Sequence, residues 1–384
     1  MRLAIITTHP IQYYAPIFKL LHTRNQISIN VYYTWGEKAL NKYDPGFNQQ
    51  VTWDIPLLNG YPYEWVLNVS DNPGTHHFKG IVNPNLAEQI NKWQPDALLF
   101  FGWAYQGHLK AIRYFSNRIH ILFRGDSTLL DEPGAIKSIL KSIYLKWVYK
   151  HIDHAFYVGS KNKDYFKKYG FKDSQLSFAP HAIDNDRFAE DRSTEAQLIR
   201  EKLGIENDDI LLLFAGKLES KKSPLLLIEA FLSLNRPGTH LLFIGNGTLE
   251  NDLKLLAANV PNIHFMPFQN QTIMPAAYQA ADLFCLPSQG PGETWGLAVN
   301  EAMACGKAIL VSDKVGCSAD LVKKNYNGAI FKSEDRADLT DKLHMLTQSK
   351  ALLNSYGENS KTLIKDWSFL KIAEAIENKL NETA

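Results

Sequence analysis

Cysteine is scarce in this chain of 384 residues, which holds only Cys285, Cys305 and Cys317. Their odd number and their lack of paired spacing argue against a disulfide framework and against a zinc site. No apolar stretch approaches the ~18 residues that a bilayer span needs, so the sequence predicts no membrane-crossing helix. Unpaired cysteines make a reducing cytoplasm the expected location.

The chain also lacks an excess of charge of either sign, because it contains 41 Lys and Arg and 40 Asp and Glu, which gives a formal net charge of +1. This balance excludes a global attraction to nucleic acid or to a membrane surface, so any such affinity must be local. An apolar content of 45% and a charged content of 21% are typical of a globular protein. The length suits two domains of roughly 150 to 200 residues.

Short apolar runs alternate with helical patterns, which is typical of a parallel sheet wrapped by helices. The opening MRLAIITTHP has an apolar run too short for a signal peptide and predicts a buried first strand. Several runs end in Gly or Pro-Ser, at the edge where open α/β sheets bind ligands. The predicted strands are 3–7, 27–34, 97–102, 119–124, 154–159, 210–216, 240–245, 263–268, 283–288 and 307–313.

The predicted architecture is therefore α/β, with two Rossmann-like domains facing each other across a cleft. Residues 1–185 form the first domain and residues 186–366 the second, with the boundary in a polar segment near 182–192. Residues 367–384 form an amphipathic closing helix.

Two glutamates in GPGETWGLAVNEAMACG, Glu293 and Glu301, form the most informative pattern. A helix that begins near Gly296 and Leu297 leaves Glu293 in the loop before it and puts Glu301 in its second turn. The backbone N–H groups between them lie at a helix N-terminus, which attracts anions. This arrangement suits an elongated ligand with hydroxyls at both ends and an anion in the middle, such as a nucleotide sugar. Taken singly, Glu293 is better explained as a turn residue and Glu301 as an exposed helix residue.

Positive charge stands earlier in the chain, in FAGKLESKKSP. Lys217 and Lys222 come directly after the predicted strand 210–216, beside Gly216. Two cations at the carboxyl end of a strand are what a diphosphate leaving group requires. A solvated charged loop is the alternative, and the glutamate pattern favours the diphosphate site over it.

Five segments, taken in order, resemble the carboxyl-terminal donor domain of retaining GT-B glycosyltransferases of family 4. They are FAGKLESKKSP, FIGNGTLEN, IHFMPFQN…MPAAYQAADLFCLPS, GPGETWGLAVNEAMACGKAILVSDKVGCSADLV and NGAIF. The resemblance covers nearly all of residues 205–380, whereas the first half matches only in its strand–helix rhythm. It implies the GT-B fold, with the helix led by Trp367 crossing back onto the first domain.

The resemblance also implies roles for single positions. The family's Glu-x7-Glu motif falls on Glu293, for the donor-sugar hydroxyls, and on Glu301, for the ribose hydroxyls. Lys217 and Lys222 correspond to the family's Arg and Lys on the diphosphate, and a lysine cannot make the bidentate contact of an arginine. The other expected donor-binding positions are Gly216 beside the lysines, Phe268 and Gln269 near the base, and Gly292, Thr294, Trp295, Gly296 and Leu297 around the helix N-terminus.

The first half offers candidates for the acceptor side. THPIQYY stands where the family often has a Gly-Gly loop, and it supplies His9, Gln12 and Tyr13. FGWAYQGH adds Trp103 and His108, since aromatic faces suit sugar rings. A turn and helix packing also account for these residues.

FRGDS places Arg124 and Asp126 at the end of the strand 119–124, where many relatives carry a histidine that touches the donor sugar. We expect both residues to belong to the catalytic set with Glu293, which positions the sugar and acts electrostatically rather than as a general base. A local Arg–Asp ion pair that shapes a turn is the alternative.

No metal and no other cofactor is expected, because the nucleotide-diphosphate sugar is a co-substrate. DND at 184–186 mimics a metal-binding Asp-x-Asp, but it falls between the predicted domains, away from the lysines. The predicted partners are a UDP- or GDP-linked sugar and a glycan or lipid-linked acceptor, without nucleic acid.

A basic segment at 137–172 holds nine Lys and two Asp among apolar residues. Such a segment can rest on an anionic leaflet. However, Lys137 and Lys146 point to opposite helix faces, and a core helix with solvated lysines explains the pattern equally well. The predicted location is cytoplasmic, with peripheral membrane contact left open.

The predicted function is a retaining, metal-independent glycosyltransferase. It would move a sugar from a nucleotide-diphosphate sugar to a hydroxyl acceptor, a glycan or lipid-linked glycan precursor of the cell surface. The alternatives are a nucleotide-sugar epimerase or a sugar phosphorylase on the same fold, or a non-catalytic sugar-nucleotide binding protein.

Overall fold

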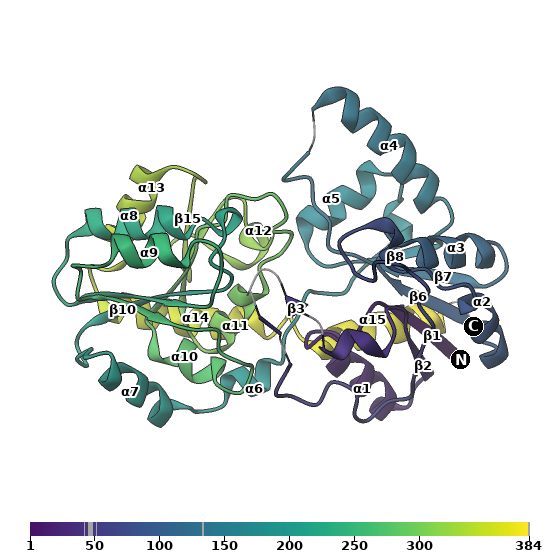
Figure 1. Cartoon of the computed structure of the whole chain (residues 1–384), viewed down its shortest axis with the longest axis horizontal. Coiled ribbons are helices and arrows are strands. Elements are labelled where there is room, and N and C mark those ends of the chain that lie inside the picture. The colour runs from purple at the N-terminus through teal and green to yellow at the C-terminus, as the bar shows by residue number, and fades with distance from the viewer. Residues whose placement is uncertain (42, 45–48, 51, 133, 383–384) are drawn as a thin grey trace. The chain divides into compact units, whose positions relative to one another are not determined.

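The computed structural model describes residues 1–41, 43–44, 49–50, 52–132 and 134–382 (Figure 1). Backbone contacts divide the chain into two units. Unit 1 consists of Met1–Lys42, Ile55–Pro180 and Phe369–Ala384, and unit 2 consists of Tyr43–Asp54 and His181–Ser368. Each unit is built on its own parallel sheet, so the predicted α/β class with two Rossmann-like domains is confirmed.

Unit 1 contains a parallel sheet in the order β5-β2-β1-β6-β7-β8-β9. The middle of its central strands β1, β6 and β7 is apolar and buried, because both faces of the sheet are covered by helices. The order reverses between β1 and β6, so the segments after these two strands lie together at the carboxyl edge. The strands are β1 Arg2–Thr7, β2 Ser28–Tyr33, β5 Tyr63–Trp65, β6 Ala97–Phe101, β7 His120–Arg124, β8 His154–Tyr157 and β9 Leu176–Phe178.

The helices of unit 1 include the last helix of the chain, α15. Its Glu377 forms an ion pair with Arg24 of α1 at 2.8 Å, and this contact confirms that the terminal helix returns to the first domain. The helices are α1 Ala15–Arg24, α2 Leu86–Trp93, α3 Gln106–Phe115, α4 Ala135–Tyr149, α5 Ser160–Lys168 and α15 Phe369–Asn381, with 3-10 turns η1 Glu37–Asn41, η2 Phe78–Gly80 and η3 Asp173–Gln175.

Unit 2 contains a parallel sheet in the order β12-β11-β10-β13-β14-β15. Numbered along the chain this is 3-2-1-4-5-6, and it reverses between β10 and β13. The strands are β10 Ile210–Ala215, β11 Thr239–Ile244, β12 Ile263–Met266, β13 Leu283–Leu286, β14 Ala308–Ser312 and β15 Gly328–Phe331, and a small antiparallel pair is β3 Tyr43–Asp44 with β4 Gln49–Gln50.

Helices cover both faces of the unit 2 sheet. Figure 1 shows α8, α9 and α13 on one face and α10 and α11 on the other. The helices are α6 Asn185–Ala189, α7 Ser193–Lys202, α8 Pro224–Leu234, α9 Glu250–Leu256, α10 Met274–Ala280, α11 Leu297–Ala304, α12 Ser318–Leu321, α13 Arg336–Leu346 and α14 Lys350–Ile364, with the 3-10 turn η4 Ser220–Lys222.

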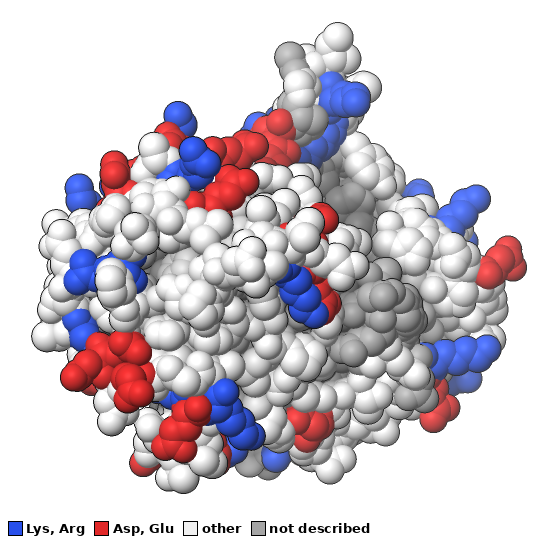
Figure 2. Space-filling model, turned by 60° about the vertical axis from the view of Figure 1, so that its left-hand side comes forward, with Lys and Arg blue, Asp and Glu red and all other residues white. Residues whose placement is uncertain are grey.

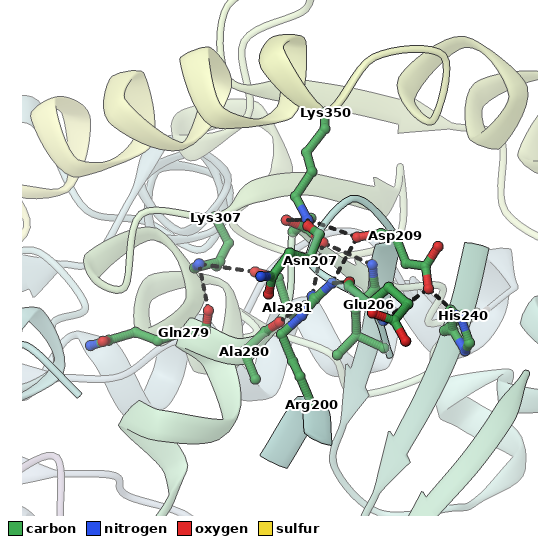
Figure 3. Close-up of polar contacts among 12 residues, drawn as sticks. Arg200, Glu206, Asn207, Asp209, His240, Gln279, Ala280, Ala281, Lys307 and Lys350 are labelled. Atoms are coloured by element: carbon green, nitrogen blue, oxygen red, sulfur yellow. Dashed lines mark hydrogen bonds and ion pairs between the residues drawn. The ribbon is translucent and has the colours of Figure 1, made fainter. Parts of the chain in front are cut away.

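Three cations hold the amino edge of the unit 2 sheet together (Figure 3). Arg200 of α7 donates to the carbonyls of Ala280, Glu206 and Asp209 at 2.7–2.9 Å. Lys307 donates to the carbonyls of Gln279 and Ala281, at 3.0 and 2.9 Å, and Lys350 donates to those of Asn207 and Asp209. These bonds satisfy carbonyls at loop and helix ends that would otherwise be buried without partners.

The segment Ile55–Pro180 of unit 1 ends five residues before the boundary expected after residue 185. Arg124 of β7 donates to the carbonyls of Ala179 and Pro180, which fixes the end of this segment. Asn185 then donates to the carbonyls of Ile364 and Trp367 at 3.2 and 3.0 Å, within unit 2. The inclusion of 43–54 in unit 2 was not expected from the sequence.

Small groups of blue and of red side chains are scattered over the mostly white face shown in Figure 2, in keeping with the net charge of +1. Among the described residues, no helix combines the length and the apolar character needed to cross a membrane.

Candidate functional site

The carboxyl edge of the unit 2 sheet brings two of the predicted motifs together. β10 and β13 are neighbours, so the loop after β10, which contains Lys217 and Lys222, lies beside the loop after β13, which contains Glu293. The backbone N–H of Gln289 donates to the carbonyl of Lys221 at 2.9 Å and fixes one loop against the other. The strand order reverses at this point, and open α/β sheets bind ligands where it does.

Glu293 is the centre of this site. Only 8% of Glu293 is exposed, and its Oε2 contacts the ammonium of Lys222. The hydroxyl of Ser288 donates to the same oxygen at 2.9 Å. A carboxylate removed from water needs such partners, so its position is fixed by a cation and a hydroxyl from two different loops.

The helix after this loop begins where the sequence predicts. α11 starts at Leu297, and its N-cap Gly296 has φ of 94°. A Cβ on Gly296 would stand 2.9 Å from Val315 Cγ1, and one on Gly316 would stand 1.7 Å from the carbonyl oxygen of Thr294. Glycine is therefore required at both positions for the loop to lie against the start of α11.

Glu301 lies in the second turn of α11 and is 4% exposed. The hydroxyl of Tyr278, on α10, donates to its Oε2 at 2.8 Å. The alternative of an exposed helix residue is therefore wrong. Along the chain, Glu293 precedes the start of α11 and Glu301 follows it.

Other predicted donor-binding positions follow the strands of this edge. Gly216 has φ of 152°, and a Cβ on Gly245 would lie 2.0 Å from its carbonyl oxygen, so the loops after β10 and β11 pass in close contact. Lys217 follows Gly216 and is partly buried. Gly292 lies in the loop before Glu293 with φ of 91°.

Trp295, another member of the predicted set, has its side chain inside the unit. It is 3% exposed, and its Nε1 donates to Oδ1 of Asn300 at 2.9 Å. Asn300 in turn donates to the carbonyl of His181 at 2.9 Å. The indole thus holds the start of α11 to the segment that enters unit 2. Thr294, before it, lies against Gly316.

Phe268 and Gln269, which the sequence predicts near the base, come after β12. The backbone N–H of Phe268 donates to Asn246 Oδ1 at 2.8 Å. The ring of Phe268 packs edge-on against Trp53, with centroids 6.3 Å apart.

The segment around Trp53 is bound to the same loop. Asn270 donates to the carbonyl of Thr52 at 2.7 Å, and the backbone N–H of Thr272 donates to Asp54 Oδ2 at 3.2 Å. Sequence reasoning missed this contact, because Asp54 and Thr272 are 218 positions apart and no motif marks the earlier segment. Ser288 and Tyr278 were also missed, although Ser288 ends a predicted strand.

Arg124 is buried at the end of β7 in unit 1. Its terminal nitrogens donate to the carbonyls of Ala179 and Pro180 at 2.6 and 2.7 Å, and burial lowers the pKa of the guanidinium to about 10. Asp126 is partly buried and, together with burial, raises the pKa of Tyr14. A catalytic role of Arg124 and Asp126 stays a prediction.

His108 is completely buried, and both of its ring nitrogens have partners. Nδ1 donates to the carbonyl of Gly102 at 2.8 Å, and Nε2 lies 2.7 Å from the hydroxyl of Thr34. Burial lowers the pKa of His108 to about 4. These contacts hold His108 in the core of unit 1, and its predicted place on an acceptor wall gains no support from them.

The remaining acceptor-side candidates lie near the carboxyl edge of the unit 1 sheet. His9 follows β1, where Nδ1 lies 2.8 Å from the hydroxyl of Thr8 and the ring packs edge-on against Trp35. Trp103 follows β6, and its Nε1 donates to the hydroxyl of Tyr149 at 3.3 Å.

Gln12 and Tyr13 complete that set and are partly buried in the turn before α1. The β1 and β6 ends meet at the reversal of strand order, so His9, Gln12, Tyr13 and Trp103 share one edge.

The DND segment has a local role at the start of α6. Asp184 is the N-cap and accepts from the backbone N–H of Arg187 at 3.2 Å. Within the described ranges, no group of three or more His, Cys, Asp or Glu side chains is arranged to hold a metal ion.

Comparison with known proteins identifies the segment that carries these motifs. Residues 195–363 match the family model of the glycosyl transferases group 1. This segment is similar to the group 1 glycosyl transferases. It contains Lys217, Lys222, Glu293 and Glu301, so the Lys222–Glu293 pair at the sheet edge lies inside the matched segment.

Curated relatives match over about half of the chain. The D-inositol 3-phosphate glycosyltransferase of Geodermatophilus obscurus is 29% identical over 201 residues, 49% of this chain and 43% of the relative. The N,N'-diacetylbacillosaminyl-diphospho-undecaprenol alpha-1,3-N-acetylgalactosaminyltransferase of Campylobacter jejuni is 25% identical over 240 residues, 60% of either chain. The match thus spans about half the length of these glycosyl transferases.

The solved structure of Anabaena HepE in complex with UDP and glucose resembles the whole chain. Its TM-score is 0.71, with 15% sequence identity and 100% of both chains covered. At this identity the likeness shows the fold alone, and the fold is that of the GT-B glycosyltransferases.

Proposed function

We propose that the protein is a retaining, metal-independent glycosyltransferase that moves a sugar from a nucleotide-diphosphate sugar to a hydroxyl acceptor. One observation carries the proposal: the buried Glu293 and the partly buried Lys222 form an ion pair at the reversal of strand order, beside the N-terminus of α11. A cation, a carboxylate and a helix N-terminus at one sheet edge suit a diphosphate joined to a polyhydroxylated ring.

The chemistry follows from the charges. Departure of a nucleoside diphosphate places negative charge near Lys217, Lys222 and the free N–H groups of α11, and each of these stabilises it. The ammonium of Lys222 has three N–H donors, and the contact with Glu293 takes one. Lys222 can therefore bind phosphate oxygens while it keeps Glu293 in place for the sugar hydroxyls.

Glu301 belongs to the other end of the ligand in this proposal. The hydroxyl of Tyr278 donates to its Oε2 and holds the carboxylate in place, and we assign recognition of the ribose hydroxyls to this carboxylate. The carboxylates and the helix N-terminus between them match the order sugar, diphosphate, ribose. Phe268 and Gln269 would then border the base.

The acceptor is proposed to be a glycan or a lipid-linked glycan precursor, as the name of the Campylobacter relative suggests. UDP- or GDP-linked sugars are the proposed donors, and UDP is bound in the Anabaena structure that shares the fold. A cytoplasmic place of action, with contact to the membrane through residues 137–172, belongs to the same proposal.

NMR of the products made from UDP-, GDP- and ADP-sugars with candidate acceptors tests the reaction. The expected product is a glycoside whose anomeric configuration equals that of the donor, formed equally well with a chelator present. An epimerised donor without acceptor, a sugar phosphate formed with free phosphate, or nucleotide binding without any product would contradict the proposal. Complete loss with chelator would contradict metal independence.

A further inference from the structure

Unit 2 contains a cavity of about 460 Å³ that is separate from the candidate donor site. Its lining comes from α7, α10, the end of α11, the turn before β14 and α14, near the amino edge of the sheet. The lysines and glutamates of the donor site come after the carboxyl ends of β10 and β13, and none of them lines this cavity. Its volume suits a small molecule, since sites for such ligands span roughly 300 to 1,000 Å³.

Three cations from three elements line the cavity. Arg200 of α7 is 7% exposed, Lys307 before β14 is partly buried, and Lys361 of α14 is exposed. Among the described residues of the lining, Asp191 alone has a carboxylate, and it accepts from the backbone N–H of Ser193 at 3.0 Å. The lining therefore has an excess of positive charge.

Close packing of α14 on the turn before β14 brings the third cation to the cavity. A Cβ on Gly357 would stand 2.1 Å from the carbonyl oxygen of Gly306. One on Gly306, which has φ of 71°, would stand 2.3 Å from Cε of Lys361. Glycine at both positions thus lets the aliphatic part of Lys361 cross the turn directly before Lys307.

Arg200 and Lys307 keep hydrogen-bond donors beyond those that hold the amino edge together (Figure 3). The ammonium of Lys307 donates to the carbonyls of Gln279 and Ala281 and has a third N–H. Arg200 uses its two terminal nitrogens for carbonyls and for Asp282. In the described part of the chain, nothing accepts from that third N–H or from Nε of Arg200. Donors of this kind favour an anionic acceptor.

The cations of the lining also repel one another. Burial lowers the pKa of the Lys307 ammonium, and the charges of Lys361 and Arg200 add to this lowering, while Asp282 opposes it. Asp282 is shared, because its carboxylate lies 3.4 Å from Arg200 and 3.6 Å from the ammonium of Lys350. A negative charge inside the cavity would offset the repulsion that remains.

Neutral polar groups stand beside the cations. Ser193 and Gln197 of α7 and Gln279 of α10 belong to the lining. The amide nitrogen of Gln197 donates to Glu201 at 3.1 Å, which turns its amide into a fixed partner for a ligand. Hydroxyl and amide groups exchange hydrogen bonds with ligand hydroxyls, whereas the cations suit phosphate oxygens.

We propose that this cavity binds a small phosphate ester that has hydroxyl groups, such as a sugar phosphate. The phosphate lies among Arg200, Lys307 and Lys361, and the hydroxyls contact Ser193 and Gln197. Binding needs neither a nucleotide sugar nor an acceptor, so this site is distinct from that of the proposed reaction. A ligand that binds only the folded state also stabilises unit 2.

Isothermal titration calorimetry of the full chain tests the site. Phosphate is also expected at the lysines of the proposed donor site, so the titrations use the K217Q/K222Q variant. Glucose 6-phosphate should bind at one site, at least about tenfold more tightly than inorganic phosphate, because its hydroxyls add hydrogen bonds. Glucose should bind at least about a hundredfold more weakly than glucose 6-phosphate. Equal affinities for glucose 6-phosphate and either of the other two compounds would overturn the assignment to a phosphate ester.

A lysine variant tests the part of the cations. K361Q, added to the same variant, should weaken binding of glucose 6-phosphate by at least about tenfold. K254Q is the matched control, because Lys254 is similarly exposed and pairs with Glu250 of its own helix at 2.7 Å, as Lys361 pairs with Glu358 at 2.8 Å.

A bulky side chain tests the cavity itself. S193W places a large ring at a lining position and should weaken binding of glucose 6-phosphate by at least about tenfold, whereas T194W, one residue further and outside the lining, should not. Both positions are exposed, so the fold should persist, and the midpoint of thermal unfolding checks this. No binding of either phosphate compound, or equal losses in test and control variants, would overturn the proposal.

Discussion

Lys222 contacts the carboxylate of Glu293, although 71 positions separate the two residues in the chain. They come from loops after β10 and β13, which are adjacent only because the strand order of the sheet reverses between them. The pair unites the cation expected at the diphosphate with the carboxylate expected at the sugar. A change to either residue therefore has consequences for the other.

Replacement of Glu293 separates its role on the sugar from nucleotide binding. E293A should lower kcat/KM of transfer by at least about a hundredfold, since a preorganised charge at the reacting ring is lost. The affinity for UDP or GDP, measured by calorimetry, should change little. E358A, at an exposed ion pair, is the matched control. Collapse of nucleotide affinity in E293A would show that the carboxylate serves the nucleotide instead.

Lys222 is expected to act on the diphosphate. K222Q should weaken binding of the nucleoside diphosphate by about ten- to a hundredfold, because a charge-assisted hydrogen bond is lost. Binding of the nucleoside without phosphates should not change. K221Q is the control next to it, since Lys221 pairs with Glu219 at 3.3 Å. Equal effects of K221Q and K222Q would show that the loop attracts the diphosphate by its overall positive charge and not through a specific contact of Lys222.

Glu301 is expected to recognise the ribose. The native protein should prefer the ribonucleoside diphosphate over its 2′,3′-dideoxy analogue by at least about tenfold, and E301Q should lose most of that preference. Y278F removes the 2.8 Å hydrogen bond to Glu301, and its preference for the ribonucleotide should lie between those of the native protein and E301Q. Competition binding measures all three ratios. An undiminished preference in E301Q would rule out contact with the hydroxyls.

His108 predicts a loss of stability in mild acid. Burial lowers the pKa of His108 to about 4, whereas an unfolded histidine titrates near ~6.5. Between these two pKa values the unfolded state binds a proton that the folded state excludes. The contribution of neutral His108 to the free energy of unfolding is therefore fully present above the unfolded pKa, and it is lost as the pH falls toward the folded pKa. The loss from this group between pH 7 and pH 5 is roughly 2 kcal/mol.

Urea unfolding of unit 1 at the two pH values measures this effect. H108N should be less stable at pH 7 and should show a pH-dependent loss smaller than the native one by that amount. H76N, at an exposed histidine, should keep the native difference. An unchanged pH difference in H108N would mean that another group causes it.

Replacement of Arg200 is expected to lower the stability of unit 2 without changing the transfer rate of the folded protein. R200M removes the guanidinium donor from the carbonyls of Ala280, Glu206 and Asp209 (Figure 3), of which Asp209 still accepts from Lys350, and should cost unit 2 about 3 kcal/mol. K202M, exposed on the same helix, should cost much less. Denaturation and transfer rate per folded molecule are measured together. A lower transfer rate of R200M with an unchanged free energy of unfolding would show that the amino edge of the unit 2 sheet affects the reaction.

Prediction from sequence succeeded where a pattern is local. All ten predicted strands are present, and their observed ends differ from the predicted ones by at most two residues. A strand of a parallel sheet is buried on both faces, so it appears in the sequence as a short, nearly continuous apolar run. The strands β3, β4, β5, β9 and β15 were missed, since two to four residues carry too little periodicity. The start of α11 was predicted because glycine is needed at Gly296.

The sequence by itself determined the elements, their order and the positions of Lys217, Lys222, Glu293 and Glu301, since strand periods and helix starts are set by neighbours along the chain. Tertiary structure decided which side chains meet. It placed Lys222 on Glu293, bound residues 52–54 beside Phe268, buried His108 and gathered three cations around one cavity. Such contacts depend on strand order and on which surfaces the core covers, and neither property is encoded in a short stretch of residues.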